Sequence, residues 1–319
     1  MKKIIISMLT MAAMVACSSE SDPIDNIDPK GDAKVEVKLN AGINYVETKA
    51  PIVTANGFLS SDLANVFFFK SEGTPDWSTV TSAISGTIKK TDGEISFTQA
   101  QFYPTNGSNL SIIGLYLGAS ATSPVPSSGI ITATIDGTQD IIYTPTAVTG
   151  SRVTPAATNL VFNHLLTQIS FKIRKDNAVT EDIALTGVKI TKVNEIDINK
   201  TVTIDLTKSS DYLSFSGSST EGFTVTGYPT ANLTDDAIPT TVTDAIMLES
   251  EISSIRVELA SDAFPSKKLT AKINGLPETN NMFEKGKAYT ITLTVKDKAF
   301  SGNATITDWD PKTGSADID

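Results

Sequence analysis

Few residues of this 319-residue chain have the type and spacing that catalysis requires. His164 is the only histidine, and histidine is the side chain best suited to moving protons near neutral pH. No GxSxG nucleophile motif accompanies it, and one histidine alone gives a metal no second imidazole. We therefore interpret His164 as a structural histidine, hydrogen-bonded near a junction between two domains.

Two pairs of carboxylates are the other candidates, because glycosidases use two carboxylates. Asp235 and Asp236 are adjacent, and Asp308 and Asp310 are close in sequence. Adjacent side chains on a strand point to opposite faces, and acidic loops are ordinary in a chain of net charge −10. We expect no catalytic residue, no metal site and no cofactor. An enzyme, such as a glycan hydrolase, is the weakest of the three hypotheses that we carry.

The only cysteine, Cys17, follows a short basic start and an apolar run that ends at Ala16. The run of 13 residues, 4–16, is too short to span a membrane, which takes about 20. It therefore indicates a secretory signal peptide over residues 1–16. The residues before Cys17 resemble the lipobox of bacterial lipoproteins, which predicts that Cys17 carries lipid such as palmitate. The alternative is an ordinary signal peptide that happens to contain cysteine.

Residues 17–32 are polar and acidic, and such a stretch cannot bury enough apolar surface to fold. We expect a flexible acidic tether. Its acidic start resembles the signal that sends some Bacteroidota-type lipoproteins to the outer face of the outer membrane. The acidic chain has no basic stripe, so we expect no nucleic-acid partner and a membrane attachment only through the lipid.

Alternating apolar and polar residues recur along the chain and predict an all-β fold. Between 33 and 39 the alternation places Val35, Val37 and Leu39 on one face. Asx-Gly turns follow at 92–93, 106–107 and 136–137, and residues 144–158 are rich in turn residues. We expect two tandem antiparallel β-sandwich domains, at 33–158 and 159–300.

Three stretches together resemble the fimbrillin family, the type V pilins of Bacteroidota-type bacteria: 162–173 (FNHLLTQISFKI), 283–295 (FEKGKAYTITLTV) and 304–309 (ATITDW). The resemblance implies transthyretin-like sandwich domains, lipoprotein export and assembly with other fimbrial subunits into surface fimbriae. It also implies that a trypsin-like protease removes the first strand, here within 33–49. A strand from the next subunit then fills the open groove.

The chain departs from the family at the cleavage position. Family members have Arg-Ala there, whereas this chain has Lys49-Ala50 and no arginine before Arg152. We expect cleavage between Lys49 and Ala50, because cutting at Arg152 would separate the two domains. We also expect the tail 301–319, with Ile306 and Trp309 as its main apolar residues, to be the donor segment. The alternative is a monomeric surface lipoprotein that binds a glycan or a host protein.

Overall fold

The computed structural model describes most of the chain, namely residues 34–43, 62–157, 159–235, 239–264, 268–276, 280–296 and 299–307. Strands dominate these residues, and the only helical element among them is a single 3-10 turn, η2 (Trp77–Thr79). No helix in these ranges is long and apolar enough to cross a membrane. The prediction of an all-β protein is confirmed.

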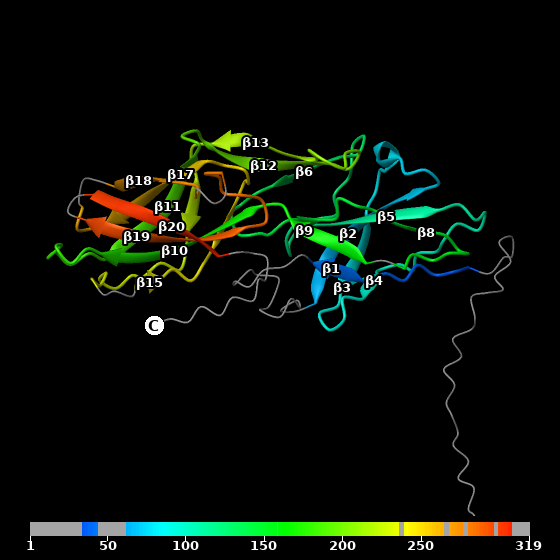
Figure 1. Ribbon diagram of the computed structural model, residues 1–319, viewed down its shortest axis with the longest axis horizontal. Helices are drawn as coiled ribbons and strands as arrows, with labels where there is room; N and C mark the ends of the chain where they lie inside the picture. Colours follow the sequence, from blue (N-terminus) through cyan, green and yellow to red (C-terminus); the bar gives the residue numbers. More distant parts are fainter. Residues whose placement is uncertain are drawn as a thin grey trace, which may run out of the picture.

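The first half of the chain forms one large sheet, on the right in Figure 1. Its strands run in the order β1-β9-β7-β5-β2-β3-β4, and β8 pairs with β5. In chain order they are β1 (Ala41–Ile43), β2 (Leu63–Glu72), β3 (Ile84–Ile88), β4 (Ile95–Phe97), β5 (Leu110–Tyr116), β7 (Ile142–Tyr143), β8 (Val148–Gly150) and β9 (Leu160–His164).

The centre of this sheet is apolar on both faces. In β2, which lies between β5 and β3, the run 66–69 is buried throughout, as its unbroken apolar sequence predicts. Gly114 of β5 packs so closely on Phe162 of β9 that a Cβ atom would lie 2.4 Å from the ring. These contacts tie β9 firmly into the sheet of the first half.

The second half forms two further sheets, which lie one above the other on the left in Figure 1. One has the order β15-β10-β19-β20, with β16 also on β10, and the other has the order β14-β11-β17-β18. Their strands are β10 (Thr167–Lys175), β11 (Leu185–Val193), β14 (Phe223–Val225), β15 (Thr240–Thr241), β16 (Ile246–Leu248), β17 (Ser254–Ser261), β18 (Leu269–Asn274), β19 (Ala288–Lys296) and β20 (Ala299–Thr307).

Apolar side chains of these two sheets are buried as the alternation predicts. Ile169, Phe171 and Ile173 of β10 have no exposed surface, and neither do the odd-numbered residues 289–295 of β19. Gly302 of β20 lies against Ile273 of β18, where an added Cβ atom would come within 3.0 Å of the isoleucine side chain. The two layers therefore pack face to face.

A small sheet of order β13-β12-β6 joins the halves. Its strands are β6 (Ile130–Thr134), β12 (Ile198–Asp205) and β13 (Leu213–Ser219). β6 belongs to the first half by sequence, yet it pairs over five positions with β12 of the second. A boundary at 158 would also cut off β9, which pairs with β1 and β7, so the sheet of the first half extends to His164.

Most strand pairs are antiparallel, as expected, but two are parallel among the residues described: β1 with β9 and β10 with β19. The turn at 92–93 joins an antiparallel hairpin of β3 and β4, with Gly93 at a φ of 74°. The turns at 106–107 and 136–137 do not close hairpins, because β5 pairs with β2, β7 and β8, while β6 leaves to pair with β12.

Candidate assembly site

The first described segment, 34–43, contacts both edges of the large sheet, because residues 35–41 bond to the stretch around β4 and residues 41–43 pair with β9, at the opposite end of the strand order. Its backbone makes five hydrogen bonds to other segments outside the regular strand pairing. Four link it to the 93–103 stretch and one links Asn40 to Leu160. The segment then continues as β1, the parallel edge partner of β9. The segment therefore connects the two ends of the strand order and is held there by other residues of the same chain.

Burial along this segment alternates, as its sequence predicts. Val37 and Leu39 are buried with exposed fractions of 3% and 5%, and Val35 is half-buried against the same core. Lys34, Glu36, Lys38 and Asn40 are exposed between them. One face of the segment thus fills the core while the other faces solvent.

The contacts between this segment and the 93–103 stretch fall into two groups. Bridges join Glu36 to Phe102 and Asn40 to Glu94, and a cavity of about 580 Å³ lies between the two. Residues 36–40 line one side of this cavity, and Ile95, Phe97 and Ala100 lie on the other. The ladder beneath the segment is therefore interrupted.

At the other end of the chain, β20 is the edge strand of its sheet, and nine of its residues pair with β19. Residues 301–307 of the expected donor tail belong to this strand. The backbone of Ile306 lies opposite Tyr289. The tail is therefore anchored within its own subunit as far as Thr307.

Seven residues that the sequence singled out lie outside the described residues: Cys17, Lys49, Ala50, Asp236, Asp308, Trp309 and Asp310. Arg152, the alternative cleavage position, is 1% exposed, and its guanidinium donates a hydrogen bond to the carbonyl of Thr105. In the folded protein the Arg152 side chain is therefore not available to the specificity pocket of a trypsin-like protease.

His164 ends β9, and its Nδ1 lies 2.7 Å from Oδ2 of Asp140. Both side chains are almost fully buried, with exposed fractions of 1% and 0%. The sequence identified His164 as structural but missed Asp140, because nothing in the local pattern relates positions 24 residues apart. In the described residues no group of three or more histidine, cysteine or acidic side chains is placed to hold a metal ion.

These features define an all-β protein in which a half-buried segment, 34–43, completes the large sheet of the first half, and the last described strand, β20, is a paired edge strand. The sequence matches the fimbrillin-like family over residues 48–309, and the chain belongs to that family. No curated protein sequence matches it.

Solved structures of proteins from Bacteroides species have a similar fold. A candidate cell adhesion protein of Bacteroides uniformis is similar with a TM-score of 0.58 and 13% identity, over 86% of this chain and 99% of the other. One from Bacteroides ovatus has a TM-score of 0.51 and 17% identity, over 88% and 99%. At these identities the likeness establishes the fold alone.

Proposed function

We propose that this chain is a structural and adhesive subunit of surface fimbriae. It is exported as an outer-membrane lipoprotein through Cys17 and assembles with other fimbrial subunits by proteolysis-triggered strand exchange. Membership of the fimbrillin-like family supports the fimbrial role. The observation that supports the assembly step is the packing of the 34–43 segment against the large sheet.

Residues 34–43, which we call the plug segment, are held with a free energy that suits a removable strand. Burying Val37 and Leu39 stabilises the fold by about 1.5–3 kcal/mol each. The five backbone hydrogen bonds add about 0.5–1.5 kcal/mol apiece. Their sum is of the same order as the whole stability of a domain, about 5–15 kcal/mol. Removing the segment leaves an apolar groove and an unpaired edge at β9, which is a template for an added strand.

A trypsin-like protease that accepts lysine removes the plug by cutting after Lys49. The burial of Arg152 supports this assignment, because a trypsin-like protease needs the arginine side chain at the alternative position to enter its specificity pocket. Before cleavage, the segment fills the groove and so prevents subunits from assembling before export. The donor is the part of the tail 301–319 that follows Thr307 in the neighbouring subunit, with Trp309 supplying an apolar side chain, because residues 301–307, Ile306 included, already pair with β19 of their own subunit.

The test of this mechanism uses purified chain that starts at Ser18 and therefore lacks lipid. Treatment with a trypsin-like protease is expected to give SDS-resistant ladders, and Lys49→Gln is expected to block them. Lys38→Gln, which changes an exposed lysine of the plug itself, serves as the matched control and is expected to leave them. Cleaved chains that stay monomeric would contradict strand exchange and favour a monomeric lipoprotein that binds a glycan or a host protein.

Two truncations separate the donor role of the tail from its role in folding. Truncation after Thr307 keeps all nine pairs between β19 and β20, whereas truncation after Gly302 removes five of them. The Thr307 truncation is expected to be folded, cleavable and unable to form ladders. If it assembles as well as the full chain, residues 308–319 are not the donor.

A further inference from the structure

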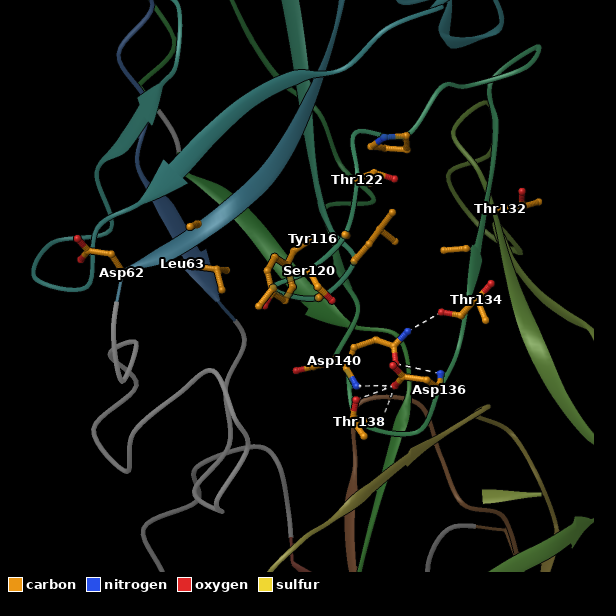
Figure 2. A pocket seen from close by; sticks show the side chains of 18 residues that line it. Asp62, Leu63, Tyr116, Ser120, Thr122, Thr132, Thr134, Asp136, Thr138 and Asp140 are labelled. Carbon is orange, nitrogen blue, oxygen red and sulfur yellow. Dashed lines mark hydrogen bonds between the residues drawn. The ribbon is translucent and has the colours of Figure 1, made fainter. Parts of the chain in front are cut away.

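Hollows of opposite charge lie in the two halves of the molecule. Figure 2 shows one of about 680 Å³ in the first half, with the exposed carboxylates of Asp62 and Asp136 on its walls. The described residues that line it include neither lysine nor arginine, so this hollow repels anions. A smaller hollow in the second half, of about 240 Å³, is different, because Lys172 is the only charged residue among the described residues that line it.

The smaller hollow lies beside β10, at the point where that strand changes partners. β15 pairs with β10 at Lys172 and Ile173, whereas β16 pairs with residues 167–169. The connection between β15 and β16 lines one side of the hollow, and the exposed side chains of Thr241 and Thr243 lie there. The other side is lined by β10 and β19. The hollow is therefore built from three segments of the second half.

The sheet face that carries this hollow is polar. In β10 the odd-numbered residues 169–173 are fully buried, so Ser170, Lys172 and Arg174 point away from the core. Three threonines of β19 pair with these positions, namely Thr290, Thr292 and Thr294. The hydroxyls of Ser170 and Thr290 are hydrogen-bonded to each other at 3.0 Å. Hydroxyl groups and two cations therefore share the outer face of this sheet.

Lys172 and Arg174 are cations that the described part of the chain does not neutralise. Neither of them makes an ion pair there, whereas lysines such as Lys89 and Lys268 do. Nε of Arg174 donates a hydrogen bond to Oγ1 of Thr294 at 3.2 Å, which orients the guanidinium and leaves its two Nη groups to a ligand. A guanidinium oriented in this way matches a carboxylate, which accepts two parallel hydrogen bonds from it.

The groups around these cations favour an acidic sugar as the ligand. Serine and threonine hydroxyls both donate and accept hydrogen bonds, as the hydroxyls of a sugar require. None of the exposed large apolar side chains of the described residues lies on this face, so it lacks the apolar and aromatic anchors of a protein interface. Without an exposed ring for stacking, the affinity must come from the charged groups, and the sugar must carry a carboxylate.

We propose that the outer face of β10 and β19 binds a carboxylate-bearing glycan. Lys172 and Arg174 hold its carboxylates, and the hollow beside Lys172 holds one sugar ring, since it is smaller than the pockets of about 300–1,000 Å³ that enclose larger ligands. This proposal names a ligand for the adhesive role proposed above and rests on that role. The face includes neither the plug segment nor the tail after Thr307, so binding does not require assembly.

Titration calorimetry on the uncut chain from Ser18 onward tests this proposal. The acidic probes are trigalacturonate and 3′-sialyllactose, and the neutral probes are the methyl ester of trigalacturonate and lactose. We expect an acidic probe to bind and the neutral probes not to bind. Tighter binding of trigalacturonate identifies a uronic acid as the source of the carboxylate, and tighter binding of sialyllactose identifies a sialic acid.

A tetraglutamate peptide with blocked ends tests the alternative of an acidic protein partner. We expect this peptide to bind more weakly than the better acidic sugar, because it has no ring hydroxyls. Equal or tighter binding of the peptide would overturn the proposal in favour of a protein ligand. Equal binding of the neutral sugars, or no binding of either acidic sugar, would also overturn it.

Substitutions with the same change in charge locate the site. Lys172→Gln and Arg174→Gln are each expected to weaken binding of the acidic sugar by about tenfold, because each removes a charge-assisted hydrogen bond. The matched control is Lys189→Gln, on β11 of the other sheet, where the lysine is half-buried and makes no ion pair with the described residues. It is expected to weaken binding by less than about twofold. Equal losses in all three variants would contradict a local site.

A variant of the wall tests the same site without removing a cation. Thr241 lies opposite Lys172 in the β10–β15 ladder, so Thr241→Glu places a carboxylate beside the ammonium group. We expect it to abolish binding of the acidic sugar while circular dichroism stays unchanged, and Thr241→Gln, of the same size, to keep it. A folded Thr241→Glu protein that binds as well as the wild type would place the site elsewhere.

Ladder formation separates this proposal from the fimbrial role. Lys172→Gln is expected to form SDS-resistant ladders after protease treatment as the wild-type chain does, because Lys172 lies outside the plug segment and the donor tail. Ladders from a wild-type chain that binds no acidic sugar would overturn the ligand and leave assembly standing. Binding of the acidic sugar by a wild-type chain that forms no ladders would support the ligand and place it on a monomeric surface lipoprotein.

Discussion

The buried pair of His164 and Asp140 is the most consequential polar contact at the scale of single residues. His164→Leu leaves the Asp140 carboxylate buried without its 2.7 Å partner. We expect this substitution to lower the free energy of unfolding by about 3–5 kcal/mol, as measured by urea denaturation. The double variant with Asp140→Leu is expected to recover most of the loss, because a matched apolar pair needs no desolvation. A single variant as stable as the wild-type protein would show that the pair is dispensable.

Cys17 is predicted to carry the lipid anchor. Cys17→Ala is expected to leave the precursor unprocessed by the lipoprotein peptidase and to release the protein from the membrane, because the acyl chains supply the attachment. Carbonate washing followed by immunoblotting of the membrane fraction measures this. Retention of the Cys17→Ala protein in the washed outer membrane would contradict lipidation at this residue.

At the scale of elements, Glu249 joins the loop after β16 to β12. It is 5% exposed and accepts hydrogen bonds from the backbone and side chain of Asn199. Burial raises the pKa of the Glu249 carboxyl above its usual value of 4.5, against the lowering effect of the bonds from Asn199. The folded state then holds a proton that the unfolded chain has lost, so this group's contribution to stability falls as the pH rises above 4.5 through the raised pKa.

Glu249→Gln removes this dependence on pH. We expect the urea midpoint of the variant, relative to that of the wild-type protein, to rise between pH 4 and pH 8 and to level off above the raised pKa. Glu181→Gln, at an exposed carboxyl, is the matched control and is expected to show no such trend. A constant difference between the Glu249→Gln and wild-type midpoints would show that the carboxyl is not buried in solution.

The sequence predicts elements well where burial follows a local period. The alternation at 33–39 identifies the faces of the plug segment, and the apolar run 66–69 identifies a central strand. It cannot predict which strands pair, because pairing depends on contacts distant in the chain. The turn at 136–137 locally indicates a hairpin, yet β6 pairs with β12, which lies some 70 residues further along the chain. The contact between His164 and Asp140 was missed for the same reason.

At the scale of the whole molecule, β6 and β12 couple the two halves. Five paired positions and one continuous apolar core cross the junction. We therefore expect a single cooperative transition in calorimetry. Thr203→Pro, in the middle of β12, removes a ladder hydrogen bond and is expected to split the transition in two. Two separate transitions in the wild-type protein would show that the halves fold independently.

The central claim is that the segment before Ala50 occupies the groove of the large sheet until a protease removes it. N-terminal sequencing of polymer purified from the cell surface tests this claim most directly. The account predicts chains that begin at Ala50, and it predicts that cells expressing Lys49→Gln carry only lipidated monomers. Polymer subunits that still contain Val35, Val37 and Leu39 would contradict it.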